Sequence, residues 1–338
     1  NNGVFVQEQI GFRDYLFLTA GARLDRHSAF GENADAAFYP KVSLSWVASD
    51  MSGWGGLGPV STLRFRGALG QSGLQPGSFD RFSTFAPASS VIGPALVPEN
   101  LGNPDLKPEV STEWEVGFEA GLFDDRMAIE ASYWDRKTTD LLIARSFPVS
   151  GGFESTQLDN IGEMVAHGLD LGISGVVYQS GSTAIDVFVN GAYLYQEVTD
   201  MGGVLPIRQA SIRNLGVIRE GFSPQSQFGG RLIDAEYPYD LNGNGSAATE
   251  AEMLAYLSQP RTVEQIEATL IGVPGLNGTL TDNYLGKSVP DWQGAFGTNI
   301  TVGDFTVGTN FAYKAGKYHA TNHTMAFRNG NPGIGRNW

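Results

Sequence analysis

The stretch that decides the fold is Val110-Ser111-Thr112-Glu113-Trp114-Glu115-Val116-Gly117-Phe118-Glu119-Ala120-Gly121. Its apolar residues recur at every second position, which is the period of a β-strand with one apolar face. The opposite face carries three glutamates, and carboxylates are too costly to bury in a dry core. That face must therefore meet water, and the segment is predicted to be a long strand between an apolar and an aqueous phase.

The same alternation recurs along the whole chain. It predicts ten strands, near residues 2–10, 15–26, 38–48, 62–71, 110–121, 126–142, 161–178, 184–198, 288–302 and 304–318. Strands of soluble domains average about 5–6 residues, whereas a tilted strand needs about 9–11 residues to cross a bilayer. The predicted strands have the membrane length. Aromatic residues near their ends suit the two interfaces of a membrane: Trp46, Trp114, Tyr133, Tyr195, Trp292 and Tyr313.

The connections between these strands alternate in length. Short turns are expected at 11–14, 123–125, 179–182 and Gly303, with a longer exception at 49–61. The other connections are long, and they comprise residues 27–37, 72–109, 143–160 and 199–287. In an antiparallel meander, short turns then lie at one end and long loops at the other, as in transmembrane β-barrels. A large soluble β-sandwich would explain the alternation but not the long strands and one-sided loops together.

The composition excludes several other classes. The 338 residues include 44 glycines and no cysteine, and the net charge is −14. Few charges and much glycine argue against a coiled coil, a helical bundle or a charge-rich disordered chain. Without cysteine there is no disulfide scaffold, thiolate metal site or cysteine nucleophile. The acidic balance argues against nucleic acid as a partner, and no apolar run is long enough for a membrane-spanning helix.

Several motifs, in order, resemble those of TonB-dependent outer-membrane receptors, specifically the SusC/RagA-like branch. The most specific is Leu101-Gly102-Asn103-Pro104-Asp105-Leu106-Lys107-Pro108-Glu109, which leads into the strand quoted above. Others are the segments at 4–9, 16–25, 39–46, 63–73, 160–163, 167–171, 286–292 and 313–316. The resemblance covers nearly the whole chain.

This resemblance implies a 22-stranded barrel in the outer membrane of a Gram-negative bacterium, with an N-terminal plug. Such receptors import glycan or peptide fragments with energy from TonB, and a SusD-like surface lipoprotein usually lids the barrel. The fold class expected here is all-β, an antiparallel transmembrane barrel segment of about ten long strands. We expect residues 1–338 to form part of one receptor barrel, without the plug and the remaining strands, and hence an open, strongly curved sheet.

The long loop at 199–287 contains a possible calcium site. Asp240, Asn242 and Asn244 stand at positions 1, 3 and 5 of a calcium-loop pattern, with Gly245 at position 6. Position 12 is Ala251 instead of the usual glutamate, and Glu250 beside it is the candidate fourth ligand. The alternative is an Asn/Gly-rich turn that caps a helix near 248–258. The loop, with this helix and a second one opening at Thr262, is a candidate contact for a lid protein or a substrate.

Neither a histidine metal site nor an enzyme is expected. His319 and His323 are four residues apart, a ligand spacing that works on a helix, but they follow a strand. His167 lies on an apolar strand face. Glu113, Glu115 and Glu119 have the alternate spacing of strand neighbours, and with Arg64 and Arg66 they are interpreted as ion pairs of a wet barrel wall.

Three functions are compatible with these features of the sequence. The first is a TonB-dependent transporter, the second a structural or binding β-protein of the outer membrane without transport, and the third a soluble carbohydrate-binding β-protein. An upstream plug domain with a TonB box would favour the first. Substrate identity is not predicted.

Overall fold

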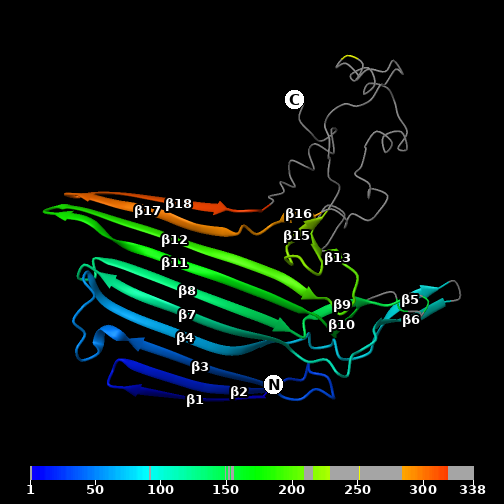
Figure 1. The fold of residues 1–338 in the computed structure, drawn as a ribbon. Coiled ribbons are helices and arrows are strands. Elements are labelled where there is room, and N and C mark those ends of the chain that lie inside the picture. The colour runs from blue at the N-terminus through cyan, green and yellow to red at the C-terminus, as the bar shows by residue number, and fades with distance from the viewer. Residues whose placement is uncertain are drawn as a thin grey trace. The chain divides into compact units, whose positions relative to one another are not determined.

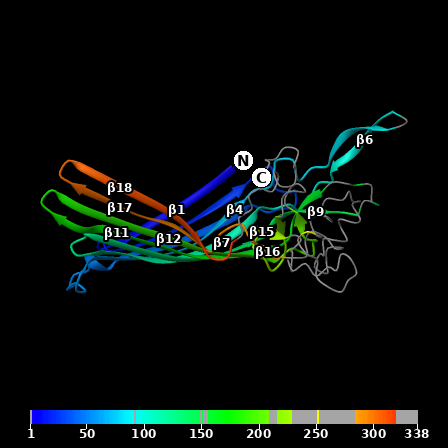
Figure 2. The same cartoon turned by 90° about the horizontal axis from the view of Figure 1, so that it is seen from above.

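The protein is described from a computed structural model, which covers residues 2–90, 93–148, 150, 153, 156–208, 216–228, 251 and 284–318. Its main feature is a ten-stranded sheet in the order β1-β2-β3-β4-β7-β8-β11-β12-β17-β18 (Figure 1). Every neighbouring pair is antiparallel. The sheet is curved and remains open between β1 and β18 (Figure 2), as expected for a barrel wall.

The ten strands of the sheet have these bounds: β1 Asn2–Phe12, β2 Leu16–Arg26, β3 Ala37–Val47, β4 Val60–Leu74, β7 Glu109–Leu122, β8 Met127–Thr139, β11 Glu163–Ser180, β12 Thr183–Asp200, β17 Trp292–Val302 and β18 Phe305–Ala315. All ten were predicted from the alternation, with ends that differ by a few residues. A short 3-10 helix, η1 Ala48–Asp50, begins the connection from β3 to β4.

Short turns connect the strands at one end of the sheet, here called the turn end. At Arg13 and Asp14, at Phe123 to Asp125, and at Gly181 and Gly303 the backbone takes positive φ values between 49° and 59°. Left-handed residues of this kind give hairpin turns whose twist matches that of the strands. The opposite end, here called the loop end, carries the long connections.

The long connections contain further hairpins that the alternation did not predict. β5 (Thr84–Ser90) pairs with β6 (Gly93–Asn100), and β9 (Leu142–Ser146) pairs with β10 (Thr156–Asn160). Three prolines in β5 and β6 interrupt the alternation, since proline cannot donate to a strand ladder.

The sheet has two chemically different faces. The polar face carries Arg64 and Arg66 of β4 and Glu113, Glu115 and Glu119 of β7. The apolar face carries the residues between them, and large side chains there are exposed, such as Val116 at 51%, Val189 at 50% and Phe311 at 55%. Contiguous apolar surface of this extent marks a face that meets lipid or another protein rather than water.

At the loop end, residues 101–108 form a rim segment. Asn103 and Pro104 open a tight turn, in which the Leu106 N–H donates to the Asn103 carbonyl at 3.3 Å. The rim segment then contacts two other loops. The Gly31 N–H donates to the Leu106 carbonyl at 2.6 Å, and the Lys107 N–H donates to Asn160 Oδ1 at 2.8 Å.

The side chain of Leu106 is 0% exposed beneath these contacts, as is that of Ala29, and Phe30 is 4% exposed. The Asn160 amide also donates to the Lys107 and Asp140 carbonyls, at 2.7 and 3.0 Å. The rim segment, which belongs to the most specific motif of the sequence, therefore joins loop 27–36 to loop 140–162.

The chain divides into two compact units. The first comprises residues 1–207, 218–224 and 289–318 and includes the whole sheet; the second comprises residues 208–217, 225–288 and 319–338. In the described part of the second unit, β15 (Ser226–Phe228) pairs with β16 (Tyr284–Lys287). The side chain of Phe228 in β15 is fully buried. The remaining short strands are β13 (Ile207–Arg208) and β14 (Val217–Ile218). Across the described ranges, no helix is long and apolar enough to cross a membrane.

Candidate functional site: the polar face of the sheet

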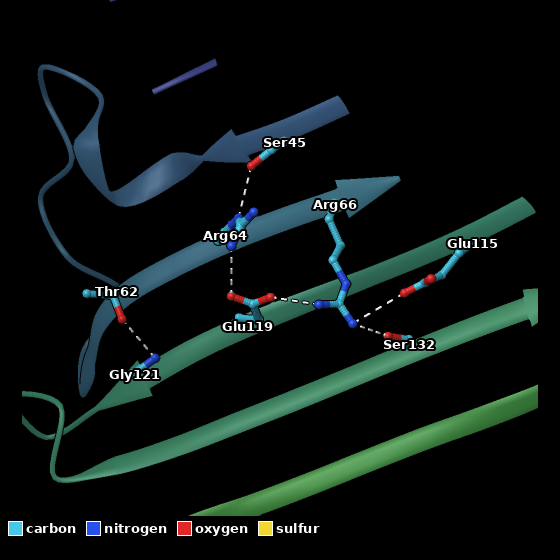
Figure 3. A network of polar contacts seen from close by, with 8 residues as sticks. All are labelled: Ser45, Thr62, Arg64, Arg66, Glu115, Glu119, Gly121 and Ser132. Atoms are coloured by element: carbon cyan, nitrogen blue, oxygen red, sulfur yellow. Dashed lines mark hydrogen bonds and ion pairs between the residues drawn. The ribbon is translucent and has the colours of Figure 1, made fainter. Parts of the chain in front are cut away.

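Arg64 occupies the β4 position opposite Glu119 of β7. Its Nη1 lies 3.3 Å from Glu119 Oε2, and its Nε donates to Ser45 Oγ of β3 at 2.9 Å (Figure 3). Alternation along β4 points this side chain and Arg66 to the same face. Three strands are thus tied together by one guanidinium.

Arg66 extends the same network toward β8. Its Nη1 donates to Glu119 Oε1 at 2.8 Å, and its Nη2 lies 3.3 Å from Glu115 Oε1 and donates to Ser132 Oγ at 2.5 Å (Figure 3). Gly117, opposite both Arg66 and Ser132, makes room for this contact. A Cβ at Gly117 would lie 3.0 Å from Ser132 Oγ and 3.2 Å from Arg66 Nε. The missing side chain of Gly117 therefore leaves the space that the Arg66–Ser132 contact occupies.

A second group of polar contacts lies closer to the loop end. Arg136 of β8 donates through Nε to Glu113 Oε2 at 2.6 Å. On the same face, Trp134 Nε1 donates to Asp170 Oδ2 of β11 at 3.2 Å. These partners come from strands adjacent in the sheet.

The ion pairs of the polar face are wet. The side chains of Arg64, Arg66, Arg136 and their glutamate partners are between 35% and 47% exposed. Pairs in such surroundings stabilise a protein by only about 0–1 kcal/mol each. The prediction that Glu113, Glu115, Glu119, Arg64 and Arg66 form ion pairs is confirmed, and the polar face is a hydrated wall. Near the turn end a depression of about 700 Å³ is lined by residues including Arg64, Glu119, Glu130 and Asn190.

On the apolar face a belt of rings crosses five strands, from β7 to β17. Successive centroids lie 5.4 Å apart for Trp114 and Tyr133, 6.4 Å for Tyr133 and His167, 6.5 Å for His167 and Tyr193, and 5.2 Å for Tyr193 and Trp292. His167 also stacks on Tyr195 at 4.7 Å. His167 is therefore part of the belt, among aromatic rings.

The belt separates two kinds of surface on the apolar face. Toward the turn end, β8 presents Met127, Ile129 and Ala131; toward the loop end it presents Asp135 and Lys137. Lys137 Nζ lies 2.8 Å from Glu163 Oε2 of β11. Aromatic rings between an apolar band and charged residues define a membrane interface.

Several predicted residues cannot be placed. Asp240, Asn242, Asn244, Glu250, His319 and His323, and the helices expected near 248–258 and Thr262, lie outside the described residues. Within the described ranges, no group of three or more His, Asp or Glu side chains is arranged to hold a metal ion. Trp134 was not recognised from the sequence, although its position next to Tyr133 places it on the opposite face.

Long antiparallel strands, an apolar face with an aromatic belt and a charged wet face together define a wall of a transmembrane β-barrel. The comparisons with known proteins agree with this class. The family described as TonB dependent receptor-like, beta-barrel matches residues 1–333. The chain belongs to this family.

Its relatives include a TonB-dependent receptor of Formosa agariphila that is 25% identical over 90% of this chain and 32% of the relative. Another receptor from the same organism is 30% identical over 47% of this chain and 16% of the relative. The TonB-dependent receptor SusC of Bacteroides thetaiotaomicron is 24% identical over 56% of this chain and 20% of its own length. The chain thus spans about a third or less of the relatives it matches.

Among solved structures, the RagAB peptide transporter matches with a TM-score of 0.69 over 93% of this chain and 33% of that chain, at 22% identity. This likeness shows the same fold. Receptors of this family are outer-membrane proteins of Gram-negative bacteria, so the described sheet is a wall segment of an outer-membrane barrel. Its apolar face meets lipid and its polar face meets the lumen.

Proposed function

We propose that the complete receptor is a TonB-dependent active transporter that imports glycan or peptide nutrients across the outer membrane. The observation that carries this proposal is the wet, charged lumen wall within a chain of this family. Charged side chains that are one-third to one-half exposed suit a hydrated path for polar cargo, whereas a purely structural surface β-protein needs no such wall.

The partners follow from the same proposal. TonB supplies the energy through a region outside this sequence, and a SusD-like lipoprotein covers the loop end, where the long loops offer contact surface. The long extracellular loop at 199–287 is the proposed contact for this lid. The substrate is an oligosaccharide or a peptide; a nucleic acid is disfavoured by the net charge of −14.

We propose no catalytic activity. Glu113, Glu115 and Glu119 each pair with an arginine in the described wall. The family is one of receptors and transporters.

Growth of the native bacterium tests the transport proposal. Strains with the intact gene, without the gene, without its TonB box and without TonB are compared on polysaccharide hydrolysates and on a protein digest. We expect growth on one nutrient class to require the gene, the TonB box and TonB. Growth that needs the gene but neither the TonB box nor TonB would reject active transport and favour the structural or binding alternative.

Calcium binding by Asp240, Asn242, Asn244 and Glu250 remains a proposal of its own, for residues outside the described ranges. Oxygen-bearing side chains at positions 1, 3 and 5 of the sequence pattern and Gly245 at position 6 support it. Calorimetric titration of the complete receptor with Ca²⁺ is expected to give heat that the Asp240→Ala/Asn242→Ala variant lacks. No heat at millimolar calcium would reject the site.

A further inference from the structure

Trp134 differs from the other tryptophans of the described strands. Trp46, Trp114 and Trp292 lie on the apolar face, whereas Trp134 stands opposite Glu115 on one side and Gly168 on the other, in the register of the polar face. A large aromatic side chain on a hydrated wall is unexpected, because burial of aromatic surface away from water is favourable.

The neighbouring strand fixes the ring. A Cβ on Gly168 would lie 2.6 Å from Cε2 and Cζ2 of Trp134, so the indole covers the β11 backbone at the position where a side chain is missing. At 3.2 Å the Nε1–H donates to Asp170 Oδ2, which sets the orientation of the ring. Trp134 is therefore a preorganised aromatic surface.

A cationic and an anionic side chain lie near this ring. The guanidinium carbon of Arg136 lies over the indole ring, 5.5 Å from its centroid, so a ligand on this face takes the place of the guanidinium. Nη2 of Arg136 pairs with Glu113 Oε2 at 2.5 Å. Arg136 and Glu113 are 47% and 35% exposed. An ion pair this exposed contributes little to stability, so its donors and acceptors can turn to a ligand at small cost.

The position along the strand suits an entry site. Trp134 follows Tyr133 of the aromatic belt, so it lies at the level of the interface on the loop side of the membrane. Arg136 and Glu113 lie one step further toward the loop end. A ligand that enters the lumen from outside meets these residues before the Arg64 and Arg66 network.

We infer that Trp134, Asp170, Arg136 and Glu113 form a subsite for a neutral sugar ring. The negative face of an indole attracts the weakly positive C–H groups of a pyranose. Sugar hydroxyls both donate and accept, which matches carboxylates as acceptors and an arginine fork as donor. The charges of Arg136 and Glu113 cancel, and the remaining carboxylate, Asp170, accepts from the Trp134 Nε1–H. This inference rests on the proposed transport function and selects glycan over peptide.

Two alternatives compete with a sugar subsite. Trp134 could serve only to cover Gly168, since an aromatic ring can stabilise a glycine on a neighbouring strand. A peptide, in turn, could use Asp170 to hold its amino group. Both alternatives are outcomes of the following experiment.

The test uses the full-length receptor purified in detergent. Saturation-transfer NMR and calorimetry measure binding of maltohexaose, cellohexaose, xylohexaose and mannohexaose, and in parallel of a tryptic casein digest. The variants are Trp134→Ala and Trp134→Phe. The matched control is Trp114→Ala, which removes a tryptophan of the apolar face, and heat-modifiable migration in gels verifies the folded barrel for each.

We expect at least one hexaose to bind, and Trp134→Ala to weaken it by about tenfold or more, as for removal of an aromatic anchor. Trp134→Phe keeps a ring over Gly168 and should bind with intermediate affinity, which preserves the test if the alanine variant does not fold. Trp114→Ala should bind normally. The subsite is rejected if no hexaose binds, if only casein peptides bind, or if both Trp134 variants bind like the wild type. TonB-dependent growth on protein digest would then leave the transport function standing.

Discussion

At the scale of single residues, the two faces of a strand set different physical conditions for neighbours in sequence. Arg66 reaches Glu115, Glu119 and Ser132 across a hydrated wall, whereas Phe65 beside it stacks on Trp46 at 5.5 Å on the apolar face. The contribution of a side chain to stability therefore depends on whether its face meets water or an apolar phase.

The Arg66–Glu119 pair should contribute little to stability. A double-mutant cycle with Arg66→Ala and Glu119→Ala is expected to give a coupling energy of about 0.2–1 kcal/mol, because both groups are more than one-third exposed. Urea unfolding of the receptor in lipid vesicles measures it, at low and high salt. A coupling above about 3 kcal/mol would show a pair shielded from water.

On the apolar face a charge should be costly. Leu171→Arg places a guanidinium four residues from the belt toward the turn end and is expected to destabilise the barrel by about 2–4 kcal/mol. Ser174→Arg, on the polar face of the same strand, is the matched control and should cost much less. Equal unfolding free energies for the two variants in vesicles would contradict the assignment of the faces.

At the scale of elements, the rim segment organises the loop end. Contacts from residues 101–108 reach loop 27–36 on one side and loop 140–162 on the other. Because its contacts join segments about 50 to 75 residues apart in sequence, each contact closes a long loop, which costs entropy that the buried Leu106 and Phe30 help to offset.

Close packing at Gly31 makes this segment sensitive to a single methyl group. A Cβ at Gly31 would overlap the carbonyl of Pro104, whereas a Cβ at Gly55 would meet nothing within 4 Å. Gly31→Ala is expected to cost about 1–3 kcal/mol, and Gly55→Ala should be neutral. Limited proteolysis should cut Gly31→Ala faster within 27–36; equal cleavage of the two variants would contradict the packing.

Asn160 should be the most sensitive polar residue of the rim. Its amide group makes three hydrogen bonds to the main chain, two with Lys107 and one with Asp140. Asn160→Ala leaves these groups without their partner, at a cost of about 1–3 kcal/mol. Lys107→Met removes only an exposed ion pair with Asp140 and is the control. Thermal unfolding followed by circular dichroism should separate them, and equal melting of Asn160→Ala and Lys107→Met would contradict this role of the amide.

These elements also show what could be predicted from the sequence. The ten strands and their faces were predicted because alternation is local and repeats in each strand, as in 110–121. The hairpins β5–β6 and β9–β10 were not, since they are short and β5–β6 contains prolines that break the pattern. The role of Trp134 depends on Gly168 and Asp170 of another strand, and no local pattern shows that neighbourhood.

At the scale of the whole molecule, the aromatic belt fixes the level of the sheet in the membrane. Trp114 and Trp292 lie in the belt, next to lipid, and Trp134 lies on the lumen side at a similar level. At one depth in the membrane, tryptophans of these strands thus lie in two environments, lipid and the aqueous lumen.

Fluorescence of receptors with one remaining tryptophan should resolve these environments. In vesicles with lipids brominated on the acyl chains near the interface, Trp114 and Trp292 should be quenched strongly and Trp134 weakly. Aqueous iodide should give the reverse order. Strong quenching of Trp134 by brominated lipid would place the polar face against the membrane and overturn the orientation.

The separation of the two faces also has an evolutionary consequence. Since even and odd positions of one strand face different phases, a mutation at Arg136 or Asp170 changes the polar wall without touching the contacts that keep the barrel in its bilayer. Selection can therefore diversify the interior of such a receptor while the exterior drifts only among apolar residues. One scaffold can in this way present many different lumen walls.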